Sequence, residues 1–252
     1  MLAIRQRCGF GCVICGLPVY EYDHMIGWAK QYEHDPENIT LLCENHHGRK
    51  TRGTLSLGTV QKYNANPVNI AKGVTAPFLL DVGAEGPFRV KIGTNWFVGV
   101  YPMMVPLIID DCALIGIQRD EGGQIGLWVQ IYDRNNRRQL LIIDNELVMS
   151  TGVWDIKFEG QVLTIREGDR DVRLRIRFTP PDQIEIESAE LTYNGVMIDV
   201  KPSGLRMNLV HQVEFVGSLF TTPVGIRVGD CPLTDGLQAV FTAREVDRYP
   251  GR

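Results

Sequence analysis

The sequence predicts an α+β chain in two parts: a small cysteine-rich domain over residues 1–66 and an all-β domain over residues 76–252, joined by a linker at 67–75. Two observations lead to this division. Four of the six cysteines and four of the five histidines lie in the first 47 residues, which is the pattern of a metal-binding segment. After the linker the hydrophobic residues recur with a period of two, which is typical of β-strands.

The composition is that of a folded globular protein. Of the 252 residues, 44% are hydrophobic and 22% are charged, which argues against intrinsic disorder. The net charge of −4 excludes a polycation, so any nucleic-acid binding must come from a local patch. The longest uncharged run, residues 92–109, contains two glycines and two prolines, so we expect no membrane span. The N-terminus lacks the pattern of an export signal, and we expect a cytoplasmic protein.

The early cysteines have the spacing of zinc ligands. Cys12 and Cys15 form a CxxC pair, and Cys43 and His46 form a CxxH pair after 27 intervening residues. Two such pairs on tight turns supply the four ligands of a tetrahedral structural zinc ion, Zn²⁺. A disulfide interpretation would need an oxidising compartment. Cys8 is a competing ligand, which we interpret as a buried spare thiol.

One helix is predicted before the linker. Apolar residues in Leu55–Tyr63 fall near helical spacing, and Thr54 or Ser56 is placed to cap the N-terminus. The segment Asn64–Pro67 ends the pattern, because a residue before proline disfavours helical backbone.

Further polar motifs surround the zinc-ligand pairs. They are Tyr22-Asp23-His24-Met25, Asn38-Ile-Thr-Leu-Leu-Cys43 and His46-His47-Gly-Arg-Lys50-Thr51. Together with the CxxC pair and in this order, they resemble the zinc-stapled HNH endonucleases over about residues 5–66. His46 stands where that family more often has a cysteine, which gives a Cys3His zinc set. The resemblance implies a ββα-metal fold, in which a hairpin is followed by a helix.

The resemblance also implies roles for the polar residues. His24 would activate the attacking water, while Asp23 and His47 would hold a divalent cation such as Mg²⁺, Mn²⁺ or Ni²⁺. Asn38 would either orient His24 or join the metal. This chemistry suits phosphodiester hydrolysis, which needs an activated water and a cation on the phosphate oxygens. Two alternatives stay open: His47 binds zinc and His46 is catalytic, or the region is a zinc-binding interaction module without turnover.

DNA is the expected partner, through the N-terminal domain. Arg49, Lys50 and Arg52 directly follow His47 and are predicted to contact the phosphates that flank the scissile bond. Solvated surface positions are the alternative for Arg52 and one neighbour. Residues 1–66 carry seven basic and six acidic residues, a balance of +1, so the remainder carries −5.

Two alternating segments in the second domain predict a hairpin. Val172–Phe178 and Ile184–Glu187 each place apolar and charged residues on opposite faces. The predicted cross-strand partners are Arg177–Glu185, Arg175–Glu187, Phe178–Ile184 and Ile176–Ile186. This register accounts for the row of arginines without invoking DNA.

The architecture of the second domain is predicted as a two-sheet sandwich or β-roll, with a β-solenoid as the alternative. Asn194-Gly195 predicts a two-residue hairpin turn. Trp96, Trp128 and Trp154 are predicted to be in the core, and Cys112 and Cys231 to be buried free thiols. The sequence leaves three roles open for this domain: binding a regulatory ligand or partner, targeting the nuclease, or assembly.

Overall fold

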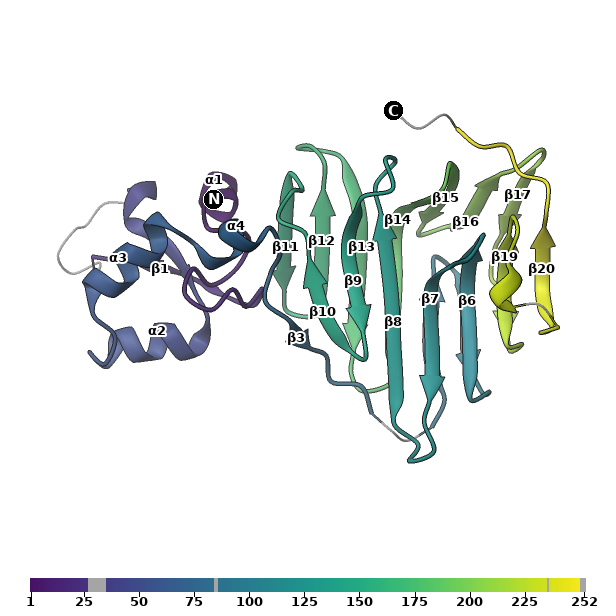
Figure 1. Ribbon diagram of the computed structural model, residues 1–252, viewed down its shortest axis with the longest axis horizontal. Coiled ribbons are helices and arrows are strands. Elements are labelled where there is room, and N and C mark those ends of the chain that lie inside the picture. The colour runs from purple at the N-terminus through teal and green to yellow at the C-terminus, as the bar shows by residue number, and fades with distance from the viewer. Residues whose placement is uncertain (27–34, 84–85, 235, 250–252) are drawn as a thin grey trace.

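The computed structural model describes residues 1–26, 35–83, 86–234 and 236–249. A small, mainly helical N-terminal region lies beside a large two-layered β-domain (Figure 1). The elements of the N-terminal region are α1 (Leu2–Arg7), β1 (Glu21–His24), the 3₁₀ helix η2 (Pro36–Asn38), β2 (Ile39–Leu42), α2 (Glu44–Thr51), α3 (Leu57–Ala65) and α4 (Val68–Lys72).

The N-terminal region is built on a hairpin followed by a helix. Strands β1 and β2 pair antiparallel, with Asp23 opposite Thr40 and His24 opposite Ile39. Helix α2 starts two residues after β2 ends. The order β1, β2, α2 is the ββα layout that the resemblance implies. It brings the end of β1 and one face of α2 together.

Helix α3 agrees with the sequence expectation. It spans Leu57–Ala65, and the Ser56 hydroxyl accepts a hydrogen bond from the Thr59 amide at 3.2 Å, so Ser56 rather than Thr54 is the N-cap. Val60 is fully buried in the small core of this region. The helix ends before Pro67, as the sequence predicts.

Residues 67–75, predicted as a linker, contain helix α4 and pack tightly. Asn69 is fully buried, and its amide Nδ2 donates to the carbonyls of Gly9 at 2.9 Å and Gly16 at 3.0 Å. Thr75 is buried as well, and its hydroxyl accepts from the Met149 amide at 3.0 Å. This segment therefore fastens the N-terminal region to the β-domain instead of leaving it on a loose tether.

The β-domain contains the remaining strands. In its first half these are β3 (Phe78–Leu79), β4 (Phe88–Ile92), β5 (Asn95–Gly99), β6 (Met103–Ile109), β7 (Cys112–Arg119), β8 (Ile125–Tyr132), β9 (Arg138–Ile143) and β10 (Glu146–Met149). In its second half they are β11 (Asp155–Glu159), β12 (Val162–Arg166), β13 (Val172–Thr179), β14 (Gln183–Tyr193), β15 (Val196–Lys201), β16 (Gly204–Asn208), β17 (Gln212–Phe215), β18 (Leu219–Phe220), β19 (Val224–Val228) and β20 (Ala239–Ala243), with the 3₁₀ helix η3 (Pro232–Thr234) before β20.

These strands form two layers around one core. In one layer the order is β3, β10, β9, β8, β7, β6, β19, β20, and strands β6 to β10 pair antiparallel in succession. In the other, β11 to β17 pair antiparallel in succession, and β14 also pairs parallel with β4. Side chains from both layers, such as Leu127, Val129, Leu174 and Ile176, share one buried cluster. This arrangement matches the two-sheet expectation rather than the solenoid.

The β13–β14 hairpin confirms three of the four predicted partners. Arg177 lies opposite Glu185, and the two predicted apolar pairs also form. The fourth partner was wrong: the register shifts between Arg175 and Ile176, so Arg175 lies opposite Ser188. Glu187 still forms ion pairs with Arg175 at 2.5 Å and with Arg177 at 2.7 Å. A one-residue bulge moves the backbone, but the long arginine side chains keep the charges together.

The β14–β15 turn is the predicted two-residue turn. Tyr193 pairs with Val196, and the two turn residues, Asn194 and Gly195, have φ angles of 47° and 78°. Positive φ at both positions is what asparagine followed by glycine tolerates best.

A buried ion pair joins the two parts. Arg5 of α1 donates from Nε and Nη2 to the two carboxylate oxygens of Asp155 in β11, both at 2.7 Å, and the two residues are 8% and 2% exposed. Arg5 also donates to the Tyr22 hydroxyl at 2.9 Å. The Gln6 amide donates to the Trp154 carbonyl at 2.8 Å. Among the described residues, no helix is both long and apolar enough to cross a bilayer.

Candidate active site

The two predicted zinc-ligand pairs converge on one point. The ligand atoms of Cys12, Cys15, Cys43 and His46 all lie within 4.8 Å of one another. Cys12 and Cys15 sit on a tight turn that is closed by a 2.7 Å hydrogen bond from the Gly16 amide to the Cys12 carbonyl. Cys43 is the N-cap of α2, and His46 lies in its first turn. The CxxC turn therefore presents two of the ligands, and the N-terminal end of α2 presents the other two.

The spacing of these atoms fits a tetrahedral zinc ion. The sulfurs of Cys15 and Cys43 are 3.7 Å apart, and His46 Nδ1 lies 3.5 Å from the Cys12 sulfur and 3.2 Å from the Cys43 sulfur. Tetrahedral bonds of ordinary Zn–S and Zn–N length give about 3.8 Å between sulfurs and about 3.6 Å between sulfur and nitrogen. The donor set and its spacing therefore match a Cys3His structural zinc site.

The electrostatics of the cluster favour a thiolate. Hydrogen bonding from the Cys15 thiol, supported by backbone amides, lowers the pKa of Cys12, and the same hydrogen bond together with burial raises the pKa of Cys15. Zinc binds cysteine as the thiolate, so one thiol of the CxxC pair is poised for the metal and its partner must lose its proton on binding.

Cys8 lies outside the cluster, as predicted. It is fully buried, its sulfur lies 4.0 Å from the Thr40 hydroxyl, and burial raises its pKa. Cys112 and Cys231 are also buried and free.

Asp23 and His47 lie together between β1 and α2. His47 Nε2 is 3.4 Å from Asp23 Oδ1, and the Asp23 side chain is only 6% exposed. Alternation along β1 directs Asp23 towards α2, and His47 stands on the facing side of that helix. A carboxylate and an imidazole in this arrangement are suitable ligands for one divalent cation, with open positions left for water and phosphate.

Glu21 is a further site residue that the sequence analysis missed. Its carboxylate Oε2 lies 2.5 Å from His47 Nδ1, so the two ring nitrogens of His47 face two different carboxylates. A carboxylate on the second ring nitrogen fixes the orientation and tautomer of a metal-binding histidine. The signal was present in the sequence, because Glu21 is two residues before Asp23 and shares its strand face.

Lys50 has a different place from the one predicted. Its ammonium lies 3.0 Å from Asp23 Oδ1 and 2.7 Å from Asp23 Oδ2, and it donates to the His24 carbonyl at 2.5 Å. The Lys50 side chain is only 16% exposed. The ammonium group therefore points into the site and contacts carboxylate and carbonyl oxygens, which are the ligands that a hard metal ion prefers.

His24 is the last residue of β1 and is half-buried. Strict alternation would turn its side chain away from Asp23, so His24 can serve the same site only where the strand ends and the chain bends. The chain bends directly afterwards at Met25 and Ile26. Lys50 contacts both the Asp23 carboxylate and the His24 carbonyl. The backbone of His24 therefore lies at the margin of the Asp23–His47 site.

Asn38 contacts this bend. Its Oδ1 accepts from the Ile26 amide at 2.7 Å, and its Nδ2 donates to the Ile26 carbonyl at 3.0 Å. The Asn38 carbonyl accepts from the Met25 amide at 2.8 Å. These contacts hold Asn38 against the two residues that follow His24.

The sequence was also compared with models of known protein families. Residues 6–53 match the HNH endonuclease family. The match spans the zinc-ligand cluster, β1, η2, β2 and α2, so it confirms the resemblance for this part of the chain. No curated protein and no solved structure matches the chain. The β-domain lies outside the family match.

Two of the three predicted phosphate contacts lie on the surface of the HNH segment. Arg49 and Arg52 are exposed at the C-terminal end of α2. Lys50 is turned inward to Asp23, which separates it from them. The arrangement leaves two arginines at the helix end for an anionic partner.

Proposed function

We propose that this protein is a metal-dependent endonuclease that hydrolyses phosphodiester bonds in DNA. The observation that carries the proposal is the convergence of Asp23 and His47 between β1 and α2, with His24 at the end of the same strand. The zinc-ligand cluster sits at the start of α2 and fixes that helix against the hairpin. The match to the HNH endonuclease family supports the same conclusion.

The residues divide the chemistry between them. Asp23 and His47 would hold a divalent cation, which would supply charge stabilisation on the phosphate oxygens. His24 accepts the proton of the attacking water, because a neutral imidazole is a suitable base near pH 7. Asn38 holds the bend after His24 through its two contacts to Ile26 and so positions the base.

DNA contact is assigned to the end of α2. Arg49 and Arg52 are exposed there and reach phosphates beside the scissile bond. No base-reading element is assigned. Cleavage therefore depends on the backbone of the duplex, and we expect it to weaken with added salt.

A plasmid-nicking assay tests the proposal. Zinc-loaded protein is incubated with supercoiled plasmid and Mg²⁺, Mn²⁺ or Ni²⁺, beside His24→Ala and beside His211→Ala, which changes an exposed histidine of the β-domain. We expect metal-dependent nicking that His24→Ala reduces by about 100-fold or more, the contribution of a general base. His211→Ala should leave the rate unchanged. Absence of nicking with every metal, or equal rates in His24→Ala, would contradict the proposal.

A second candidate function is a zinc-stapled binding module without turnover. One observation favours it: the Lys50 ammonium already neutralises Asp23, at the position that a catalytic cation would need. Under this alternative the protein binds DNA in a gel-shift assay, with or without added divalent metal, and never nicks it.

A further inference from the structure

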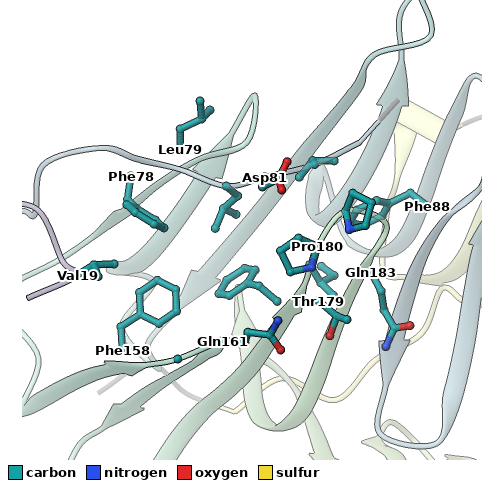
Figure 2. Close-up of a pocket in the computed structure, with 16 residues that line it drawn as sticks. Val19, Phe78, Leu79, Asp81, Phe88, Phe158, Gln161, Thr179, Pro180 and Gln183 are labelled. Carbon is teal, nitrogen blue, oxygen red and sulfur yellow. The ribbon is translucent and has the colours of Figure 1, made fainter. Parts of the chain in front are cut away.

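A cavity of about 280 Å³ lies where the N-terminal region meets the β-domain. Its wall is mainly apolar. In Figure 2 the rings of Phe78 and Phe158 lie at the same end of the lining as Val19, and Pro180 lies at the other end. The walls come from the loop before β1, from β3, from β11 and from the β13–β14 turn. The cavity is therefore shared by segments that are far apart in the sequence.

Three aromatic rings in mutual contact form one wall of the cavity. Phe78 and Phe158 meet edge to face with centroids 5.8 Å apart, and Phe158 and Phe178 are tilted at the same separation. Aromatic rings in such clusters favour a further ring in an edge-to-face or offset position. Leu79 at the rim is 68% exposed and Val19 is 45% exposed, so apolar surface extends from the cavity to solvent.

The size and polarity of the cavity define its occupant. An apolar cavity of about 150 Å³ lined by Leu, Ile and Phe accepts benzene, so the present volume suits roughly two fused rings. Among the described lining residues, Asp81 alone is charged, which disfavours an anionic ligand. The Gln161 amide and the Thr179 hydroxyl also line the cavity, and neither forms a side-chain hydrogen bond with another described residue. They provide donors and acceptors for one polar group.

We propose that this cavity is a binding site for an uncharged two-ring aromatic molecule that bears one hydrogen-bonding group. Phe78, Phe158 and Phe178 contact the rings, and Gln161 and Thr179 contact the polar group. The site is separate from Asp23 and His47, and its existence does not depend on nuclease activity. Because Val19 lies two residues before β1, a ligand here touches both the segment that leads to the active site and the β-domain.

A fluorescence titration of the full-length, zinc-loaded chain tests this site. The probe is Prodan, an uncharged naphthalene dye with one carbonyl group, whose emission shifts to the blue in apolar surroundings. We expect saturable binding by the unmodified chain. Val19→Trp and Gln161→Trp place a large side chain at the rim, where the original residue is solvent-exposed, and each should weaken binding by about tenfold or more.

Val240→Trp on β20 is the matched control, because Val240 is 51% exposed and lies outside the cavity. It should bind Prodan like the unmodified chain, and the melting temperatures of all three variants establish that they fold. Three results would overturn the site: no saturable binding by the unmodified chain, undiminished binding by either rim variant in its folded form, or an equal loss in Val240→Trp.

Discussion

At the scale of single residues, the placement of Lys50 is the most consequential finding. The sequence analysis grouped it with Arg49 and Arg52, because all three follow His47. On a helix, however, residues three apart share a face, so Lys50 stands beside His47 and faces β1. The structure accordingly places its ammonium 2.7 Å from Asp23 Oδ2. Closeness in the sequence predicted one basic cluster, but the helix turns Lys50 towards β1 and leaves Arg49 and Arg52 exposed to solvent.

Lys50 is expected to compete with the catalytic cation. Replacing it in Lys50→Met removes a positive charge from Asp23, so Mn²⁺ should bind at least about tenfold more tightly. The variant should also melt at a lower temperature without Mn²⁺, because Asp23 is left buried without its partner. Calorimetric Mn²⁺ titration and melting curves with and without Mn²⁺ measure both effects.

Lys62→Met is the matched control, since Lys62 is an exposed residue of α3. Its Mn²⁺ affinity should equal that of the unmodified chain. Equal or weaker Mn²⁺ binding by Lys50→Met would show that the ammonium does not occupy the cation position.

At the scale of elements, alternation along β1 organises the site. It turns Glu21 and Asp23 towards α2 and Tyr22 towards Arg5. The sequence predicted the ββα order and the residues Asp23 and His47 through motif resemblance. It did not predict Glu21, because that residue lies outside the motif and meets the site through its 2.5 Å contact with His47.

Glu21 is expected to support metal binding through His47. In Glu21→Gln the ring loses a charged acceptor at Nδ1, and Mn²⁺ affinity should fall by about 10- to 100-fold. Glu37→Gln is a suitable comparison, because its side chain is 82% exposed and contacts Arg7. Titration calorimetry on both proteins checks the effect. If the two variants bind Mn²⁺ equally well, Glu21 has no such role.

The zinc cluster is expected to hold the hairpin and α2 in place. Cys43→Ser should lose zinc and unfold residues 1–66, because small zinc domains depend on the metal for folding. Cys8→Ser should retain one zinc, since Cys8 lies outside the cluster. Elemental analysis with hydrogen exchange distinguishes the two. Retained zinc in Cys43→Ser, or loss in Cys8→Ser, would require a different ligand set.

Regular elements were more predictable than contacts between them. Helix α3 and most of the β13–β14 register followed from local periodicity, but the bulge at Arg175 has no local signal. The prediction that three tryptophans lie in the core was wrong: Trp96, Trp128 and Trp154 are all only partly buried. Trp128 instead lies across Gly116 on the neighbouring strand, where a Cβ would come within 2.0 Å of its ring. Hydrophobic size alone did not reveal which strand face each ring occupies.

At the scale of the whole molecule, the two parts are joined by polar contacts that the sequence did not indicate. Arg5 and Asp155 are 150 residues apart, and periodicity carries no information about such a pair. The ion pair is bidentate and buried, and Arg5 also contacts Tyr22 in β1. The β-domain therefore supports the strand that carries Asp23 and His24.

Breaking this pair is expected to be costly. Asp155→Ala leaves Arg5 buried without its counter-ion, so stability should fall by about 3–5 kcal/mol. Asp182→Ala breaks the partly exposed pair with Arg89 and should cost about 1 kcal/mol or less. Denaturant unfolding of both variants measures the difference. Similar losses in the two would mean that the Arg5–Asp155 pair does not hold the parts together.

Anomalous diffraction from Mn²⁺-soaked crystals tests the central claim most directly, because it locates each metal by element. The account predicts zinc bound by Cys12, Cys15, Cys43 and His46, and manganese bound by Asp23 and His47 with the Lys50 ammonium moved off the carboxylate. An empty cysteine cluster, or manganese absent from Asp23 and His47 at saturating concentration, would contradict it.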